Sequence, residues 1–204
     1  MELAGYHLHM AEPMHRARNK KVDGRHERVR TGKIQAYKAL LELFADGRVN
    51  PSQSELAATA GISERTLFRY FNSYEDVIAG AIGYFFPSLQ NFFEAEVPKG
   101  NLEHRLRMLA QLRVSFVKQN GVMARSTEAL APTSESARLA KYFRDTFFPD
   151  QTTQWIGDDL SYIDNAELAV VQNLFSFLSV DALFTTLGDS CIEPIVKVAL
   201  SAFK

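Results

Sequence analysis

Two arginines share one face of a short predicted helix. Residues 64–71, with the sequence ERTLFRYF, have helical spacing, in which successive residues are separated by about 100°. Arg65 and Arg69 are four residues apart and point the same way, flanked by Thr66 and Phe68. Arginine presents a planar fork of N–H donors that fits guanine edges and phosphate oxygens. The pattern favours a helix that presents its cations outward to a polyanion.

The opposite face of this helix carries Leu67 and Phe71 and predicts packing onto a preceding short helix. The stretch Ser52-Gln-Ser-Glu55 has the form of a capping box and begins that helix, while Ser63 can cap the second one. Gly61 supplies a tight turn between the two. This is helix-turn-helix geometry, in which the second helix enters the DNA major groove. A plain helical hairpin with two solvated arginines is the alternative.

Residues 31–78 resemble the N-terminal domain of the TetR/AcrR family of bacterial transcriptional regulators. The resemblance is carried, in order, by IQAYKALLELFADG, SELAATAGIS and RTLFRYFNSYEDVI. It implies an all-α fold, with an N-terminal three-helix helix-turn-helix DNA-binding domain joined to a C-terminal helical ligand-binding and dimerisation domain. The chain departs from the family at Arg65, Phe68 and Tyr74, where many relatives have a small residue, a tyrosine and a lysine. Whether Phe68 and Tyr74 make the phosphate contacts that are usual in the family is therefore in question.

The predicted DNA contacts come from the beginnings of the two short helices and from the outer face of the second. Arg65 suits guanine, Thr66 suits a base edge or a phosphate, and Arg69 and Tyr70 suit the backbone. The full predicted set is Ser52, Ser54, Ser63, Arg65, Thr66, Phe68, Arg69, Tyr70 and Tyr74.

Charge is distributed unevenly along the chain. Residues 1–70 hold 12 Lys and Arg against 8 Asp and Glu, and residues 71–204 hold 11 against 16, so the net charges are +4 and −5. We expect residues 1–30 to form a basic flexible arm, which either touches DNA or is simply solvated. Residues 31–73 would form the helix-turn-helix domain and residues 74–204 the ligand-binding and dimerisation domain.

The C-terminal two thirds are predicted to be helical, and no strand pattern is present. Pro87 should kink or divide the first of these helices. The family resemblance implies that the last two helices pair across a twofold axis, and their wide apolar surfaces favour a homodimer. The predicted helices are 74–95, 101–119, 121–130, 134–148, 164–187 and 192–203.

Aromatic residues gather in the middle of the chain and could line a cavity for a small effector. Core packing is the alternative for these aromatic residues, and a surface position is the alternative for the polar candidates. The candidate ligand-binding residues are His104, Arg113, Phe116, Glu128, Phe143, Phe147 and Trp155.

Composition narrows the function classes. With 204 residues, of which 46% are hydrophobic and 23% charged, the chain is globular, and no export signal or membrane-spanning apolar run is evident. We expect a cytoplasmic protein without membrane contact. The single cysteine, Cys191, excludes internal disulfides and cysteine-based zinc sites. No phosphate-binding loop, HExxH motif or nucleophile elbow is present, so we expect no enzyme, no cofactor and no metal.

These features predict a sequence-specific DNA-binding transcriptional regulator. The family resemblance makes it a repressor, released from a palindromic double-stranded DNA operator by a small, largely apolar effector that the sequence does not identify. A helical small-molecule-binding or carrier protein with a degenerate helix-turn-helix is the alternative.

Overall fold

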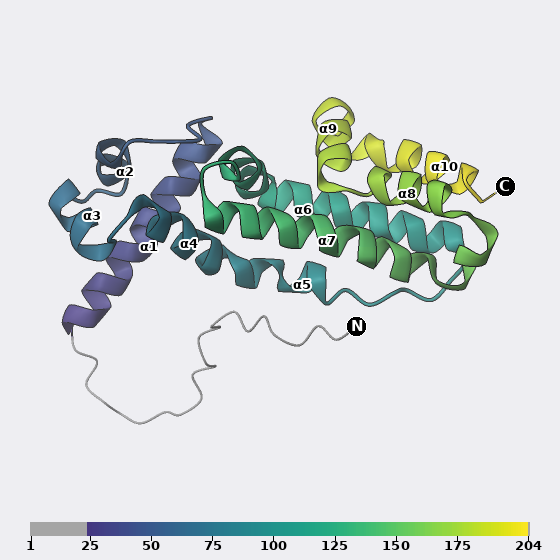
Figure 1. Cartoon of the computed structure of the whole chain (residues 1–204), viewed down its shortest axis with the longest axis horizontal. Coiled ribbons are helices and arrows are strands. Elements are labelled where there is room, and N and C mark those ends of the chain that lie inside the picture. Colours follow the sequence, from purple (N-terminus) through teal and green to yellow (C-terminus); the bar gives the residue numbers. More distant parts are fainter. Residues whose placement is uncertain (1–23, 204) are drawn as a thin grey trace, which may run out of the picture.

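The computed structural model describes residues 24–203, and within this range the chain forms helices and no strands. Figure 1 shows an elongated molecule with α1, α2 and α3 at one end, here called the head (residues 24–73). Helix α4 leads from the head along the rest of the molecule, here called the body (residues 90–203). The head helices are α1 (Gly24–Ala45), α2 (Gln53–Thr59) and α3 (Glu64–Tyr70). The all-α prediction is confirmed.

Helix α1 begins at Gly24, about three turns before the apolar pattern that starts at Ile34. The prediction of a flexible arm through residue 30 is therefore wrong for residues 24–30, while residues 1–23 lie outside the described range. Arg28 Nε donates to the Gly24 carbonyl, and Glu27 lies in the first turn, where a carboxylate favours helix formation. Residues 24–33 carry no apolar face, so periodicity alone could not detect this segment.

The ends of the head helices follow the sequence closely. Ser52 accepts from the Glu55 N–H while the Glu55 carboxylate accepts from the Ser52 N–H, so the predicted capping box is confirmed. After α2, the N–H groups of Gly61 and Ile62 return to the Ala58 and Ala57 carbonyls at 3.1 and 3.0 Å. Gly61 has a φ of +67°, which only glycine adopts without strain. This turn sets the angle between α2 and α3.

Helix α4 (Tyr74–Phe85) ends where Pro87 begins to shape the backbone. A 3-10 turn, η1 (Phe86–Leu89), and a four-residue helix, α5 (Gln90–Phe93), follow it. The predicted division at Pro87 is confirmed, because proline has no N–H to continue the α-helical ladder.

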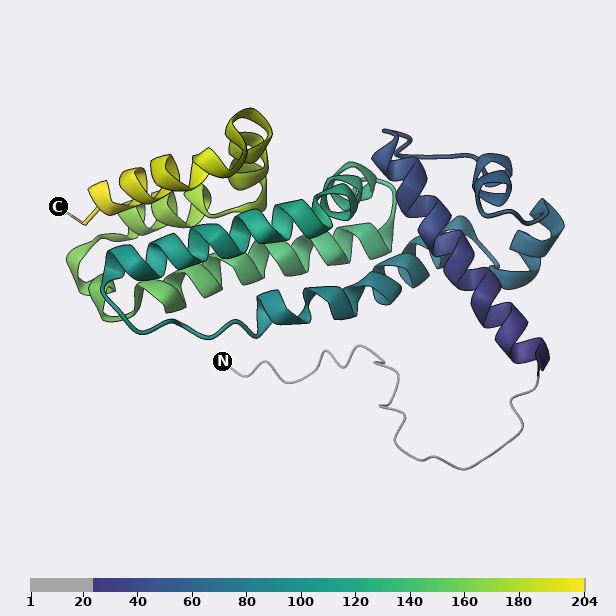
Figure 2. The ribbon, with the colours of Figure 1, turned by 180° about the vertical axis from the view of Figure 1, so that it is seen from behind.

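Two long helices, α6 (Leu102–Leu130) and α7 (Glu135–Ile156), form the antiparallel centre of the body (Figure 2). The predicted break at Asn120-Gly121 is wrong, because one glycine costs only about 1 kcal/mol and α6 buries apolar side chains along its whole length. Helix α7 continues through Pro149 beyond its predicted end at 148. Arg105 donates to the Trp155 and Ile156 carbonyls at 2.8 Å and satisfies the end of α7.

The last helices of the body are α8 (Asn165–Leu174), α9 (Phe177–Leu187) and α10 (Ile192–Ser201). The prediction of one helix over 164–187 is wrong, because the chain breaks at Phe175 and Ser176. Ser176 caps α9 by accepting from the Ser179 N–H, and Arg113 of α6 donates to the Phe175 carbonyl. The donor that holds this break comes from a distant part of the sequence, which apolar spacing does not reveal.

Two apolar clusters support this arrangement. The body cluster lies among α5–α10 and includes Phe116, Phe148 and Trp155. The head cluster includes Leu40, Leu56 and Leu67 and also the body residues Leu130 and Ala137. The ends of α6 and α7 therefore complete the core of the head.

Among residues 24–203, no single helix is long and apolar enough to cross a bilayer, and only the bent pair Asn165–Leu174 and Phe177–Ser201 meets the length and composition requirement. The same part of the chain contains no group of three or more His, Cys, Asp or Glu residues able to hold a metal ion.

Candidate nucleic-acid interface

Helix α3 presents two different faces, as its spacing predicted. Leu67 is 3% exposed and Phe71 5%, and both belong to the head cluster. Arg65 and Arg69 are exposed, and Phe68 between them is 56% exposed. A core helix would not leave a phenylalanine uncovered between two cations, so this face is shaped to meet something outside the head.

The arginines of α3 have no acidic partner within residues 24–203. The Arg69 guanidinium lies 5.4 Å from the centre of the Tyr70 ring, a cation–π contact that leaves its N–H groups free to donate. By contrast, Arg48, between α1 and α2, forms an ion pair with Glu55. The outer face of α3 thus carries two exposed cations without a carboxylate partner in the described part of the chain.

The serine and threonine candidates are partly occupied by helix capping. Ser63 Oγ accepts from the Thr66 N–H at 3.2 Å and lies 3.0 Å from Thr66 Oγ1. Ser52 is engaged with Glu55, whereas Ser54 is exposed at the beginning of α2. These residues surround the beginnings of α2 and α3, where unpaired backbone N–H groups and the helix dipole favour an anion.

Tyr70 fixes α3 against α1. A Cβ atom built on Gly32 would lie 2.3 Å from the Tyr70 ring and 2.8 Å from its hydroxyl oxygen, so only glycine permits this approach. Tyr70 is half-buried by the contact, and its position holds the orientation of the exposed α3 face.

Tyr74 points into the protein. Its hydroxyl oxygen is buried and has no hydrogen-bond partner in the described part of the chain. Burial raises the pKa of Tyr74 to about 12, because the phenolate would lose its hydration. This hydroxyl does not face the surface beside α3, and we drop Tyr74 from the phosphate contacts.

Glu75 joins the head to the body. Its carboxylate accepts from the Ser136 backbone N–H at 2.7 Å, in the first turn of α7. Desolvation opposes the charged form, but hydrogen bonds from Ser136 and Ser134 and the charge of Arg138 lower the pKa of Glu75 overall. Glu75 lies in the stretch RTLFRYFNSYEDVI that carries the family resemblance, but its partners lie about 60 residues further along the chain and no local signal identifies them.

The seven predicted ligand-binding residues do not all belong to one site. His104 and Glu128 lie near opposite ends of α6, and 24 residues of helix separate them by about 36 Å. His104 is exposed, and Phe143 is 43% exposed. Phe116 and Trp155 are buried in the body cluster, and Phe147 packs edge-to-face on Phe93 with ring centres 4.8 Å apart. These aromatic rings pack on one another, which was the alternative interpretation.

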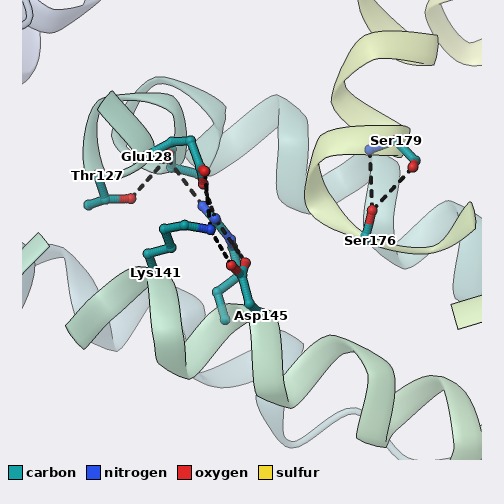
Figure 3. Close-up of polar contacts among 8 residues, drawn as sticks. Thr127, Glu128, Lys141, Asp145, Ser176 and Ser179 are labelled. Carbon is teal, nitrogen blue, oxygen red and sulfur yellow. Dashed lines mark hydrogen bonds and ion pairs between the residues drawn. The ribbon is translucent and has the colours of Figure 1, made fainter. Parts of the chain in front are cut away.

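Two charged candidates, Arg113 and Glu128, contact other groups within the body. The alternative that Arg113 lies on the surface is wrong, because Arg113 is 1% exposed. Glu128 is committed to an ion-pair cluster with Lys141, Arg144 and Asp145, which joins α6 to α7 beside the first turn of α9 (Figure 3). No local pattern predicts this cluster, because its members become neighbours only when α6 and α7 pack.

Comparison with known proteins places this geometry in context. No protein-family model matches the chain. Over 122 residues the chain is 32% identical to the nucleoid occlusion factor SlmA of Marinomonas sp. (strain MWYL1), a match that covers 59% of this chain and 58% of that protein. The match thus spans less than two thirds of that relative. The fold is similar to that of a transcriptional regulator from Rhodococcus sp. Rha1, with a TM-score of 0.62, 15% sequence identity and coverage of 83% of this chain and 95% of the other.

The sequence match and the shared all-helical fold support each other, because they come from different relatives. The match to SlmA agrees with the resemblance of residues 31–78 to the TetR/AcrR family, and the likeness to the Rhodococcus structure shows the shared fold.

Proposed function

We propose that this protein is a sequence-specific DNA-binding transcriptional regulator. The observation that carries the proposal is the outer face of α3, where Arg65 and Arg69 are exposed without an acidic partner in residues 24–203. Phosphate oxygens and guanine edges are the acceptors that such unpaired guanidinium groups fit. The names of the two relatives, a nucleoid occlusion factor and a transcriptional regulator, agree with a role on DNA.

The contacts follow from the position of each side chain. Arg65, in the first turn of α3, reads a guanine edge, and Thr66 lies against the same groove. Arg69, one turn later, holds a phosphate, and Tyr70 supports it through the cation–π contact. Phe68 provides apolar contact, for example with a thymine methyl group. The beginnings of α2 and α3 lie beside the sugar-phosphate backbone of the DNA, and there the contacts come from Ser52, Ser54 and Ser63.

A homodimer would present two α3 helices to one operator. Four apolar side chains of α8, α9 and α10 remain largely exposed, at 57, 56, 44 and 48%: Val170, Leu178, Leu187 and Val198. A twofold axis through this surface would bury them and could place the two α3 helices one DNA turn apart, about 34 to 36 Å. The operator would then be palindromic.

Regulation would act through α4, which begins directly after the head and is divided from α5 at Pro87. We propose that the protein is a cytoplasmic repressor and that a small, largely apolar effector shifts the body between two arrangements. Such an effector releases DNA only if it binds the two arrangements with different affinities.

A helical carrier with a degenerate helix-turn-helix is the second candidate. The packed aromatic core of the body and its buried polar groups are compatible with that function. The two candidates differ in one property, because a carrier has no need for the uncompensated charge on α3.

Footprinting on DNA from the region upstream of the protein's own coding sequence tests the proposal. We expect a palindromic protected site for the wild type and no protection for Arg65→Ala. Lys99→Ala, which removes one exposed positive charge far from α3, should protect the same site as the wild type. Binding without sequence preference, or an identical footprint for Arg65→Ala, would favour the carrier.

A further inference from the structure

Two arginines are buried in the body, and only one of them has a counter-charge. Arg144 is 5% exposed, lies over the Phe177 ring and forms ion pairs with Glu128 and Asp145. Arg113 is 1% exposed and lies 3.9 Å from the centre of the Phe148 ring, but no carboxylate of residues 24–203 contacts it. A buried charge is normally paired, because an isolated ion loses its hydration.

The partners of Arg113 are neutral oxygens. Its Nε donates to the Phe175 carbonyl at 3.0 Å, one terminal nitrogen donates to the Phe148 carbonyl at 3.1 Å, and the other donates to Gln151 Oε1. A guanidinium has five N–H donors, so these three bonds leave two without an acceptor. Desolvation lowers the pKa of Arg113 to about 9, as expected for a cation buried without an anion.

Gln151 is held in the orientation that serves Arg113. Its Nε2 donates to the Phe92 carbonyl of α5 at 2.9 Å, which leaves Oε1 to face the guanidinium. The contact between Arg113 and Gln151 is therefore also a contact between the centre of the body and the short helix α5.

A second unpaired donor lies on the same face of α7. Phe148, Gln151 and Trp155 are spaced by three and four residues and so share one side of the helix. Trp155 is 3% exposed, and its indole Nε1 has no hydrogen-bond partner within the described residues. An indole nitrogen can only donate, so no rotation of the side chain would turn it into an acceptor. Buried unpaired groups of this kind are rare and point to a missing partner.

We propose that the body binds a small apolar carboxylate, such as an alkyl or aryl acid, with its carboxylate group on Arg113 and the Trp155 indole. This proposal rests on the effector-binding function proposed above and specifies the chemistry of the effector. One uncompensated positive charge matches a monoanion, and the neighbouring rings of Phe92, Phe116 and Phe148 suit an apolar tail. A carboxylate would supply the acceptors that Arg113 and Trp155 lack.

The ligand would enter by displacing α5. Arg113 and Trp155 are 1% and 3% exposed, and neither the hollow along α10 nor the one beside Phe68 and Tyr74 is lined by them, so the core must open to admit a ligand. Helix α5 is only four residues long and is tied to the centre by the bond between Gln151 and the Phe92 carbonyl. A carboxylate that competes for Arg113 frees Gln151 and loosens this tie, and α5 connects through η1 to α4.

The single tryptophan makes the test direct, because Trp155 is the only indole in the chain and reports from the proposed site. We would titrate the full chain with octanoate and octanol, and with benzoate and benzyl alcohol, and follow Trp155 fluorescence and calorimetry. The acid of at least one pair should bind about tenfold or more tightly than its alcohol, as a charge-assisted hydrogen bond requires. Equal binding of acid and alcohol in both pairs, or no binding of either acid, would overturn the proposal.

Variants place the preference on Arg113. Arg113→Gln should abolish the preference for the acid, whereas Arg125→Gln, which alters another α6 arginine that pairs with Asp181, should keep it. If Arg113→Gln does not fold, Trp155→Phe, followed by calorimetry, should reduce acid affinity several-fold and leave alcohol affinity unchanged. An unchanged preference in either folded variant would contradict the proposal.

DNA binding is measured separately, so that the two proposals can fail independently. Sequence-specific DNA binding without carboxylate selectivity would refute this inference and leave the regulator in place. Carboxylate selectivity without sequence-specific DNA binding would support this inference and refute the proposed regulator.

Discussion

Helix α3 and the body use arginine in opposite ways. On α3, Arg65 and Arg69 are exposed and have no carboxylate partner in the described chain. In the body, most arginines bind other groups of the same chain. Four form ion pairs with carboxylates, and Arg113 is fully buried among neutral oxygens. Under the proposed function, the unpaired charge on α3 serves an external anion, whereas the paired charges of the body join its helices to one another. The ion-paired body arginines are Arg105, Arg107, Arg125 and Arg144.

The largest effect should come from the paired buried arginine. Arg144→Met removes the buried guanidinium that pairs with Glu128 and Asp145 and donates to the Ala124 carbonyl. Only Lys141 then still pairs with the two carboxylates, and we expect a loss of about 3 kcal/mol in the free energy of unfolding. The matched change Arg125→Met, at an exposed ion pair, should cost less than about 1 kcal/mol. Urea denaturation of both variants measures the difference. Equal losses in the free energy of unfolding would show that the buried cluster stabilises the protein no more than the exposed ion pair does.

An intermediate effect is expected where α3 meets α1. Gly32→Ala places a Cβ against the Tyr70 ring and should cost about 1 to 3 kcal/mol while weakening DNA binding through the displaced α3. Gly83→Ala in α4 meets no atom within 4 Å and should be neutral or stabilising by up to about 1 kcal/mol. Thermal denaturation and DNA titration of both variants test this. Unchanged DNA affinity in Gly32→Ala would show that the Tyr70 contact does not orient α3.

The smallest effect concerns the link between head and body. Because the pKa of Glu75 is lowered from its ordinary value of 4.5, its contribution to stability is present above that pH and is lost as the pH falls through the lower, folded-state pKa. Glu75→Gln should cost about 1 kcal/mol at neutral pH and flatten the acid side of the stability curve below pH 4.5. Denaturation at several pH values measures this slope. If the free energy of unfolding of the wild type and of Glu75→Gln fell equally steeply below pH 4.5, Glu75 would not be the group whose protonation destabilises the protein.

The sequence predicted the head better than the body, for a physical reason. The ends of α2 and α3 depend on Ser52, Glu55, Gly61 and Ser63, which act on backbone groups within a few residues. The faces of α3 follow from the same local spacing, so the exposed arginines were predictable. Helix capping and turns depend on residues close in sequence, so local sequence patterns predict these helix ends correctly.

The body depends on partners distant in sequence. The break between α8 and α9 involves Arg113 donating across 62 positions to Phe175, and the continuity of α6 through Gly121 depends on packing against other helices. The burial of Arg113 could not be read from spacing either, since an arginine on an amphipathic helix is usually solvated. Tertiary packing overrode local propensity at each of these positions.

The most direct test of the account is the DNA affinity of the double variant Arg65→Ala/Arg69→Ala on the footprinted operator, compared with Lys99→Ala and the wild type across a salt series. We expect Lys99→Ala to match the wild type. The double variant should lose about tenfold or more in affinity at each salt concentration and show a shallower dependence on salt, because each protomer makes fewer phosphate contacts. Equal affinity and equal salt dependence for all three proteins would contradict the claim that the outer face of α3 reads DNA.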